Sequence, residues 1–148
     1  MALSLSVVTA QRSVLERDGV TKLVVPAADG QITILPKHAA LLTALGIGEM
    51  HIHSGGSVET IVIHGGFMQV LHDDVSVLAD AAEHVDDIDL ARAEAARERA
   101  QRRLEGRDAD IPRSGVDVLR AQLALQRSLV RIRVARRRSP TGAPSSRP

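Results

Sequence analysis

The chain has 148 residues, enough for one mid-sized domain or two small ones, and 44% of them are hydrophobic, which suffices for a buried core. It has no cysteine, which excludes disulfides, a thiol nucleophile and cysteine-ligated zinc or iron–sulfur sites, and Phe67 is its only aromatic residue. The net charge of +1 is unevenly placed, with 4 basic and 9 acidic residues in 1–85 but 15 basic and 9 acidic residues in 86–148. This asymmetry predicts two modules with different surroundings.

The N-terminal residues contain no basic stretch followed by an apolar core, so we expect no signal peptide. No run of residues approaches the ~20 consecutive apolar positions that a membrane-spanning helix needs. We therefore expect an intracellular protein that is soluble or attached to the periphery of a membrane, without direct insertion into the bilayer.

The first half of the chain is typical of short strands. Residues 50–53 alternate apolar and polar side chains, Gly55-Gly56 follow as a turn signal, and residues 58–63 are rich in β-branched side chains, which predicts a hairpin. Turns recurring about every 8–12 residues favour an antiparallel sandwich or barrel. The other predicted strands cover residues 20–27, 32–35, 67–71 and 75–79.

The hydrophobic period changes near Asp86-Asp87, whose carboxylates suit the N-cap and first turn of a helix. Residues 88–104 are rich in the strong helix formers Ala, Glu and Arg, and Gly106 and Pro112 end this helix. A second helix is predicted over residues 116–137, after a polar loop. Each helix carries one narrow apolar stripe, so the two should pack as an antiparallel hairpin. The stripes are Leu90, Ala93, Ala100 and Leu104, and Val118, Ala121, Leu125, Leu129 and Ile132.

The predicted fold class is therefore α+β, with an N-terminal antiparallel β-sandwich over residues 1–85. It is followed by a C-terminal antiparallel two-helix hairpin over residues 86–138. Residues 139–148 are rich in serine and proline, which predicts a disordered tail.

Four local motifs, taken in chain order, resemble those of the epsilon subunits of bacterial F-type ATP synthases. Residues 29–38 (Asp-Gly-Gln-Ile-Thr-Ile-Leu-Pro-Lys-His) are similar to the family's Gly-x-Leu-Gly-Ile-Leu-Pro-x-His segment. Residues 64–70 (His-Gly-Gly-Phe-Met-Gln-Val) resemble its Gly-Gly-Phe-x-x-Val strand, and residues 75–83 its final strand. Residues 88–93 (Ile-Asp-Leu-Ala-Arg-Ala) are similar to its Ile/Leu-Asp-x-x-Arg-Ala motif. The departures from the family's usual residues are Thr33, Ala40, His64 and Gln69.

The resemblance implies a non-catalytic rotor subunit that requires no cofactor and lies at the cytoplasmic face of the cell membrane. The sandwich would contact the gamma subunit and the ring of c subunits, so that proton-driven rotation reaches the catalytic sites. The hairpin would lie folded on the sandwich, or extend along gamma to the catalytic β subunits and block ATP hydrolysis. The implied gamma and c-ring interface includes Asp29, Gly30, Pro36 and His38.

In some members of that family ATP holds the hairpin folded, which implies a regulatory ATP site here. The spacing is compatible, because Arg92 and Arg99 share one helix face and Arg127 and Arg131 share another. A polyphosphate would relieve the repulsion between converging pairs. The alternative is a solvated or salt-bridged face, with Glu94, Glu98 and Glu105 as partners. The implied site comprises Glu83, Ile88, Asp89, Arg92, Ala93, Arg99, Arg127 and Arg131.

Seven arginines lie between Arg120 and Arg138, with no acidic residue among them. The resemblance favours contact with an acidic segment of the β subunits, and a solvated basic face is the alternative. Nucleic-acid binding is not expected, because stacking aromatics and recognised motifs are absent.

The sequence does not favour a metal site, a phosphate loop or a catalytic site. His51 and His53 share a strand face and could join His64 or His72 at a metal, but no carboxylate stands in ligand register with them, so no metal site is expected. Gly65-Gly66 lacks the Gly-Lys-Ser/Thr of a phosphate loop, which favours a bulge or a close backbone approach. No catalytic constellation is present. The rival classes are a free-standing nucleotide sensor and a small sandwich enzyme that uses the histidines.

Overall fold

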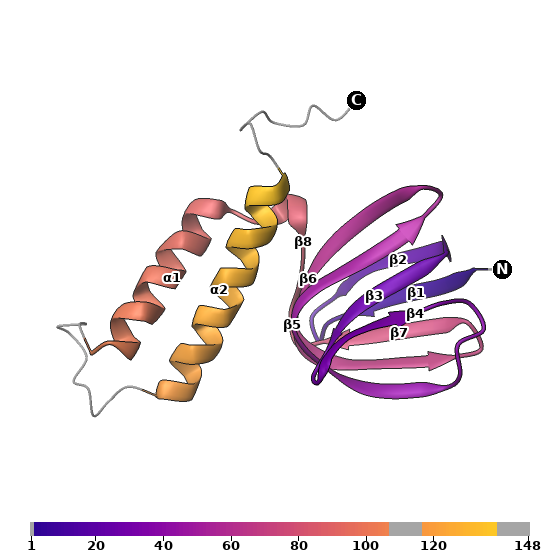
Figure 1. Ribbon diagram of the computed structural model, residues 1–148, viewed down its shortest axis with the longest axis horizontal. Coiled ribbons are helices and arrows are strands. Elements are labelled where there is room, and N and C mark those ends of the chain that lie inside the picture. Colours follow the sequence, from indigo (N-terminus) through magenta and orange to yellow (C-terminus); the bar gives the residue numbers. More distant parts are fainter. Residues whose placement is uncertain (1, 107–116, 139–148) are drawn as a thin grey trace. The chain divides into compact units, whose positions relative to one another are not determined.

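The computed structural model describes residues 2–106 and 117–138, and the chain divides between His84 and Val85 into two compact units. Of the elements that lie within the described residues, the first unit holds all the strands and the second holds the two α-helices (Figure 1). The predicted β-sandwich followed by two helices is therefore confirmed. The tail 139–148 and most of the predicted loop after Gly106 lie outside the described residues.

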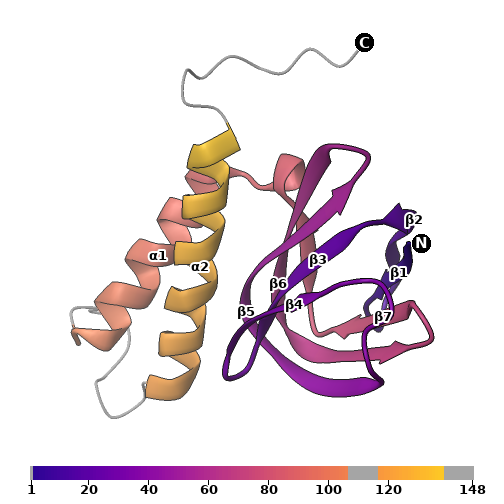
Figure 2. The same cartoon turned by 45° about the vertical axis from the view of Figure 1, so that its right-hand side comes forward.

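The first unit is one curled sheet of eight strands with the order β2-β1-β7-β6-β5-β3-β4, and β8 pairs with β6. The sheet folds over on itself, so that its inner face encloses the core (Figure 2). All pairings are antiparallel except that between β1 and β7, which is parallel. The strands are β1 (Leu3–Val8), β2 (Ser13–Val20), β3 (Lys22–Ala27), β4 (Gly30–Ile34), β5 (Leu41–Ser54), β6 (Ser57–Leu71), β7 (Asp74–Ala79) and β8 (Ala82–His84).

The predicted hairpin across Gly55-Gly56 joins the two longest strands, β5 and β6, and Ser54 pairs with Ser57 at its tip. Both glycines have positive φ, 56° and 79°, as a two-residue hairpin turn of this kind requires. Strand β6 then serves both halves of the curled sheet, because it pairs with β8 over Ile61–Ile63 and with β7 over Gly66–Leu71. The strand changes neighbours at Gly65-Gly66.

Gly66 marks a close approach of two backbones. Its φ is 128°, and a Cβ atom there would lie 2.1 Å from the carbonyl oxygen of Leu78 and 2.8 Å from the Cα of Ala79. The expected bulge or close backbone approach at this glycine pair is thereby confirmed. The phosphate-loop interpretation is wrong, because the pair lies inside a strand and opens no helix.

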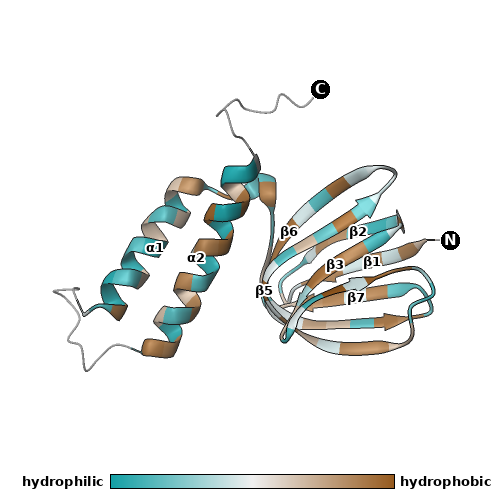
Figure 3. Cartoon of the chain, viewed as in Figure 1, coloured by the Kyte–Doolittle hydropathy of each residue, from teal (hydrophilic) through white to brown (hydrophobic). Residues whose placement is uncertain are grey.

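The core of the first unit consists of aliphatic side chains and methionines, as the lack of aromatics predicts. Along β1 and β7 buried residues alternate with more exposed ones. Figure 3 shows how hydrophobic and hydrophilic residues are distributed along the strands. Fully buried side chains include Leu3, Leu23, Ile34, Met50, Ile52, Ile61, Ile63 and Met68.

The second unit begins with a 3-10 turn, Val85–Asp87, followed by α1 (Leu90–Leu104). The predicted N-cap at Asp86-Asp87 is wrong. Asp89 caps α1, and its carboxylate accepts a hydrogen bond from the backbone N–H of Arg92 at 3.2 Å. The chain makes the extra 3-10 turn first, which buries Ile88 and leaves Asp89 at the helix start.

The second helix, α2 (Val118–Arg138), packs against α1. Asp117 precedes it and accepts from the backbone N–H of Arg120 at 3.1 Å. The predicted stripe on this helix is partly wrong, because Val118 and Leu129 are exposed. The buried positions include Ala121, Ser128, Ile132 and Ala135, opposite an α1 stripe whose buried members are Ala93 and Ala100. The face of α2 that is buried therefore includes Ser128 and not Leu129.

Candidate functional site

The outer face of the first unit carries a row of apolar side chains across four strands. Phe67 on β6 pairs with Ala44 on β5 and with Leu78 on β7, which in turn pairs with Val8 on β1. Residues directly opposite each other share a face of the sheet, so these four form one continuous line, called here the apolar row. Phe67 is 57% exposed and Leu78 59% exposed.

Two more leucines extend the apolar row into a patch. Leu42 on β5 is 72% exposed, and Leu71 on β6 is 44% exposed. Both lie on the same face as Phe67, because they are separated from the row by even numbers of residues along their strands. Contiguous exposed apolar side chains of this kind are typical of protein–protein contact surfaces. The signal was present in the sequence as adjacent apolar residues at 67–68, 70–71 and 77–78, which interrupt the alternation.

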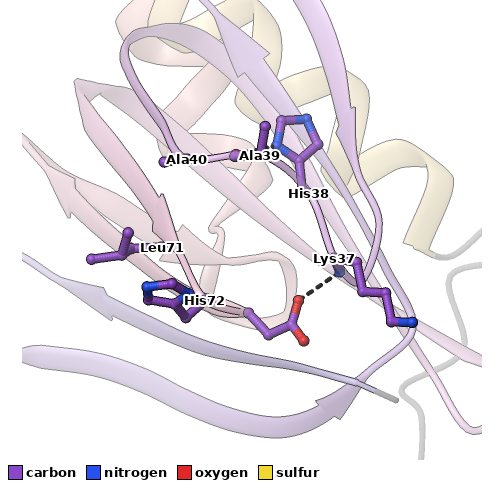
Figure 4. A pocket seen from close by; sticks show the side chains of 7 residues that line it. Lys37, His38, Ala39, Ala40, Leu71 and His72 are labelled. Atoms are coloured by element: carbon purple, nitrogen blue, oxygen red, sulfur yellow. Dashed lines mark hydrogen bonds between the residues drawn. The ribbon is translucent and has the colours of Figure 1, made fainter.

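Leu71 also lines an open pocket of about 460 Å³ at one end of this unit (Figure 4). The pocket lies between the loop after β4 and the β6–β7 turn. In it the backbone N–H of Lys37 donates to the carboxylate of Asp73 at 2.6 Å and joins the two loops. Lys37, His72 and Asp73 all have φ between 50° and 63°, so both loops depend on left-handed backbone. The lining residues are Lys37, His38, Ala39, Ala40, Leu71, His72 and Asp73.

The pocket contains His38, one of the predicted interface residues. The Nδ1 of His38 lies 2.7 Å from the carbonyl oxygen of Ala39, which requires a proton on that nitrogen and leaves Nε2 as the acceptor in the neutral ring. Pro36 lies in the same loop, whereas Asp29 and Gly30 belong to the β3–β4 turn. Their role at an interface stays a prediction.

The arginines predicted to bind ATP lie on the two helices of the second unit. The ion pair between Glu94 and Arg136, with 3.0 Å between Oε1 and Nη2, marks one edge of the helix pair. An α-helix turns by about 100° per residue. Relative to the buried Ala93, Glu94 therefore lies on one side of α1, and Arg92 and Arg99 lie on the other side. We call the edge opposite the Glu94–Arg136 pair the arginine edge.

The same geometry applies to α2, where Ser128 is buried. Relative to Ser128, Arg136 lies on the side of the Glu94–Arg136 pair, and Arg127 and Arg131 lie on the other side, at the arginine edge. All four predicted arginines therefore share one edge of the helix pair. Arg92 and Arg99 are exposed, and Arg127 and Arg131 are half-buried.

Two of the three acidic residues expected as alternative partners pair with other arginines. Glu94 pairs with Arg136, and Glu98 pairs with Arg102 one turn along α1 at 2.9 Å. Both pairs are largely exposed, so each contributes little to stability. These two pairs do not include the four predicted arginines, and the choice between a bound anion and a salt-bridged face stays a prediction.

The other predicted ATP-site residues have structural roles. Ile88 and Ala93 are buried, and Asp89 is the N-cap of α1. Glu83 lies on β8 in the first unit, and its Oε2 is 3.1 Å from the Nε2 of His64. The role of all these residues at a nucleotide stays a prediction.

The histidines considered for a metal do not converge in the described part of the chain. No group of three His, Cys, Asp or Glu side chains within residues 2–106 and 117–138 is arranged to hold a metal ion. The Nδ1 of His51 instead lies 3.2 Å from the hydroxyl of Thr60 on the neighbouring strand. Among the described helices, none is long and apolar enough to cross a membrane.

Two family descriptions cover almost all of the described chain. The ATP synthase delta/epsilon chain beta-sandwich domain matches residues 2–85, and the long alpha-helix domain of the same chain matches residues 86–136. The chain belongs to the ATP synthase epsilon chain family. The resemblance carried by the four motifs is thereby confirmed.

Curated epsilon chains from several bacteria are similar over most of their length. The epsilon chain of Solibacter usitatus is 46% identical over 133 residues, which is 90% of this chain and 95% of that protein. The epsilon chain of Desulforamulus reducens is 40% identical over 131 residues, 88% of this chain and 95% of that protein.

Two solved structures share the epsilon chain fold. A chain in the cryo-EM structure of the Euglena gracilis mitochondrial ATP synthase (OSCP/F1/c-ring) is 20% identical, with a TM-score of 0.73 over 86% of this chain and 78% of that one. A chain in the central stalk/c-ring structure from Tetrahymena thermophila is 14% identical, with a TM-score of 0.55 over 94% and 97% of the two chains. At these identities the likeness concerns the fold.

Proposed function

We propose that this epsilon chain is a non-catalytic rotor subunit that couples proton-driven rotation to ATP synthesis and restrains ATP hydrolysis through its helical unit. Family membership and the titles of the solved neighbours, which name F1, the c-ring and the central stalk, support assembly into such a complex. The observation that carries the proposal is that the two units of the chain have different surfaces. One unit displays an apolar patch, and the other is a strongly basic helix pair with a small buried core.

The apolar row and its flanking leucines are the proposed docking surface for gamma. Six apolar side chains on one rigid sheet face can bury enough area for a stable contact, since apolar burial contributes about 25 cal/mol per Å². The pocket loop with Pro36 and His38, together with the turn at Asp29-Gly30, is the proposed contact toward gamma and the c-ring. These contacts would hold the chain at the cytoplasmic face of the membrane without any segment entering the bilayer.

The helical unit is the proposed regulatory element. The buried residues of its two α-helices are four alanines, Ser128, Val130, Ile132 and Val134, so its apolar core is small and a modest free energy can separate two arrangements. Ligands and partners can then shift the unit between two states according to their differential affinity. In the extended state, the exposed arginines of α2 would meet an acidic segment of the β subunits, which makes inhibition salt-sensitive.

The test is ATP hydrolysis by the catalytic head with gamma, titrated with the full chain and with residues 1–85. We expect saturable inhibition by the full chain. Residues 1–85 should co-elute with the head without inhibiting it, because the first unit has its own core and contact patch. Equal inhibition by both would contradict regulation by the helices, and failure of the full chain to co-elute would contradict the stalk role itself. A free-standing nucleotide sensor predicts this last outcome.

Regulatory ATP binding is a second proposed function, favoured by the arginine edge. Bidentate guanidinium contacts to phosphate are among the strongest charge-assisted hydrogen bonds, and each one removed costs about 1.5–3 kcal/mol. Titration calorimetry with millimolar ATP and magnesium should show saturable heat for the native chain. Arg127→Gln and Arg131→Gln should each weaken binding about tenfold or more.

Arg136→Gln is the matched control for this titration. It removes the same charge from the same helix, but on the edge where Glu94 already neutralises it. If Arg136→Gln weakens binding as much as Arg127→Gln, the effect is one of general charge and the arginine edge is not the site. If the native chain gives no heat above that of dilution, the proposal of ATP binding is wrong.

A further inference from the structure

The last strand of the first unit is short and sits next to the point where the chain divides. β8 contains only three residues, and His84 at its end directly precedes the second unit. Its pairing is with β6, where Ala82 stands opposite Ile63, Glu83 opposite Val62 and His84 opposite Ile61. A three-residue strand with one described neighbour has few backbone hydrogen bonds to hold it.

Side chains hold β8 from both faces of the sheet. Glu83 and His84 point to opposite faces, since successive residues of a strand alternate. On one face Glu83 Oε2 lies 3.1 Å from the Nε2 of His64, whose side chain is only 2% exposed. On the other face the Nε2 of His84 lies 3.1 Å from the Oε1 of Glu59. In the first contact β8 supplies the carboxylate and β6 the imidazole, and in the second contact β8 supplies the imidazole and β6 the carboxylate.

Glu59 is itself held in place for this contact. Arg17 on β2 donates to both of its carboxylate oxygens, from Nη2 at 2.9 Å and from Nε at 3.0 Å. These hydrogen bonds hold the pKa of Glu59 below its usual range and raise that of Arg17. Glu59 is therefore a fixed anion that orients the ring of His84.

The direction of the His64–Glu83 hydrogen bond follows from the other nitrogen of the ring. The Nδ1 of His64 is buried without a hydrogen-bond partner, so a proton there would be an unsatisfied buried donor. The favoured ring therefore carries its proton on Nε2 and donates it to Glu83. This fixes the direction of the hydrogen bond from the sheet to β8.

We propose that β8 is a detachable strand, and that the His64–Glu83 and His84–Glu59 contacts form a two-sided clamp that sets where the sheet ends and the connector to the helices begins. With the clamp closed, the chain is fixed to the sheet as far as His84. With it open, three residues join the connector and extend its reach by about 10 Å. The clamp therefore regulates how far the helical unit can move from the sheet, whichever partner it meets.

The clamp is strong enough to hold the strand and weak enough to open. The His84–Glu59 contact is partly exposed, as is Glu83, and ion pairs of that exposure contribute little individually. Local opening of a terminal strand then requires much less free energy than unfolding of the sheet.

Amide hydrogen exchange on the full chain, followed by mass spectrometry, tests the clamp. In the native chain the amides of residues 82–84 should exchange faster than those of β6 and β7. His84→Ala should speed their exchange about two- to fivefold, and His64→Ala with His84→Ala more than that, while β7 stays unchanged. His51→Ala is the matched control, because its ring contacts Thr60 in the same sheet and it lies on β5, which pairs with the edge of β6 opposite to β8. It should leave the exchange of β8 unaltered.

Three outcomes would overturn the proposal. One is exchange of β8 at the rate of the whole sheet in the native chain, which would mean that it does not open separately. Another is an unchanged exchange rate of the β8 amides in His84→Ala. If His64→Ala unfolds the sheet, the His84→Ala variant alone tests the proposal. The third is an equal acceleration in His51→Ala. Exchange is measured on the isolated chain, so its result does not depend on the proposed roles in the ATP synthase.

Discussion

Replacing Phe67 and Leu78 together by aspartate should weaken binding to gamma at least 100-fold without unfolding the chain. Each side chain is more than half exposed, so aspartate is tolerated in the isolated protein. At an interface the same change removes the burial of a large apolar group, about 1.5–3 kcal/mol each, and adds the desolvation of a carboxylate. Since 1.4 kcal/mol is a factor of ten in affinity, two such changes exceed 100-fold.

Calorimetric titration of gamma into the variant measures this loss, and circular dichroism of the free chain checks the fold. The matched control is Val58→Asp, which is 55% exposed on the same strand, β6, near the hairpin tip and away from the apolar row. It should bind gamma as the native chain does. Native affinity in the double aspartate variant would show that gamma docks elsewhere on the chain.

The largest expected effect on stability is that of Gly66→Ala. Its Cβ would overlap the backbone of the adjoining strand at Leu78 and Ala79, and backbone cannot rotate away as a side chain can. The positive φ of 128° adds a conformational penalty of about 1–3 kcal/mol. Together with overpacking of about 1–3 kcal/mol, the loss reaches about 2–6 kcal/mol, a large part of the 5–15 kcal/mol available to a domain.

Denaturant unfolding followed by circular dichroism measures this loss, because the chain has no tryptophan or tyrosine to report by fluorescence. Gly19→Ala is the matched control. Its φ is 69°, but nothing lies within 4 Å of the added Cβ, so it should cost only about 1–2 kcal/mol from the left-handed backbone. Similar losses of unfolding free energy in the two variants would mean that the strands move apart at Gly66 at little cost, and that the close approach does not limit stability.

The elements of this protein could be predicted from its sequence, because the signals for them are local. The glycine pair of the β5–β6 hairpin demands positive φ, and the change from a period of two to one of 3.6 marks the start of the helices. The same local motifs, including residues 29–38 and 88–93, were sufficient to indicate the family.

The pairing of distant strands and the choice of buried helix positions were decided only by the tertiary structure. Pairing depends on contacts between residues far apart in the sequence, which no local window contains. It makes β1 parallel to β7 and aligns Phe67 with Leu78 into the apolar row. It likewise buries Ser128 and leaves the more hydrophobic Leu129 exposed, since the face of α2 that is buried depends on how the helix packs.

The same limit applies to the polar contacts that define the candidate sites. The four arginines could be named from their spacing, but their common edge depends on how α1 and α2 pack, which the Glu94–Arg136 pair reveals. The clamp on β8 joins Arg17, Glu59 and His84, which come from three different strands. Sequence determined the elements and the family through short-range periodicity and turn chemistry, whereas the surfaces arise from long-range packing that brings separate elements together.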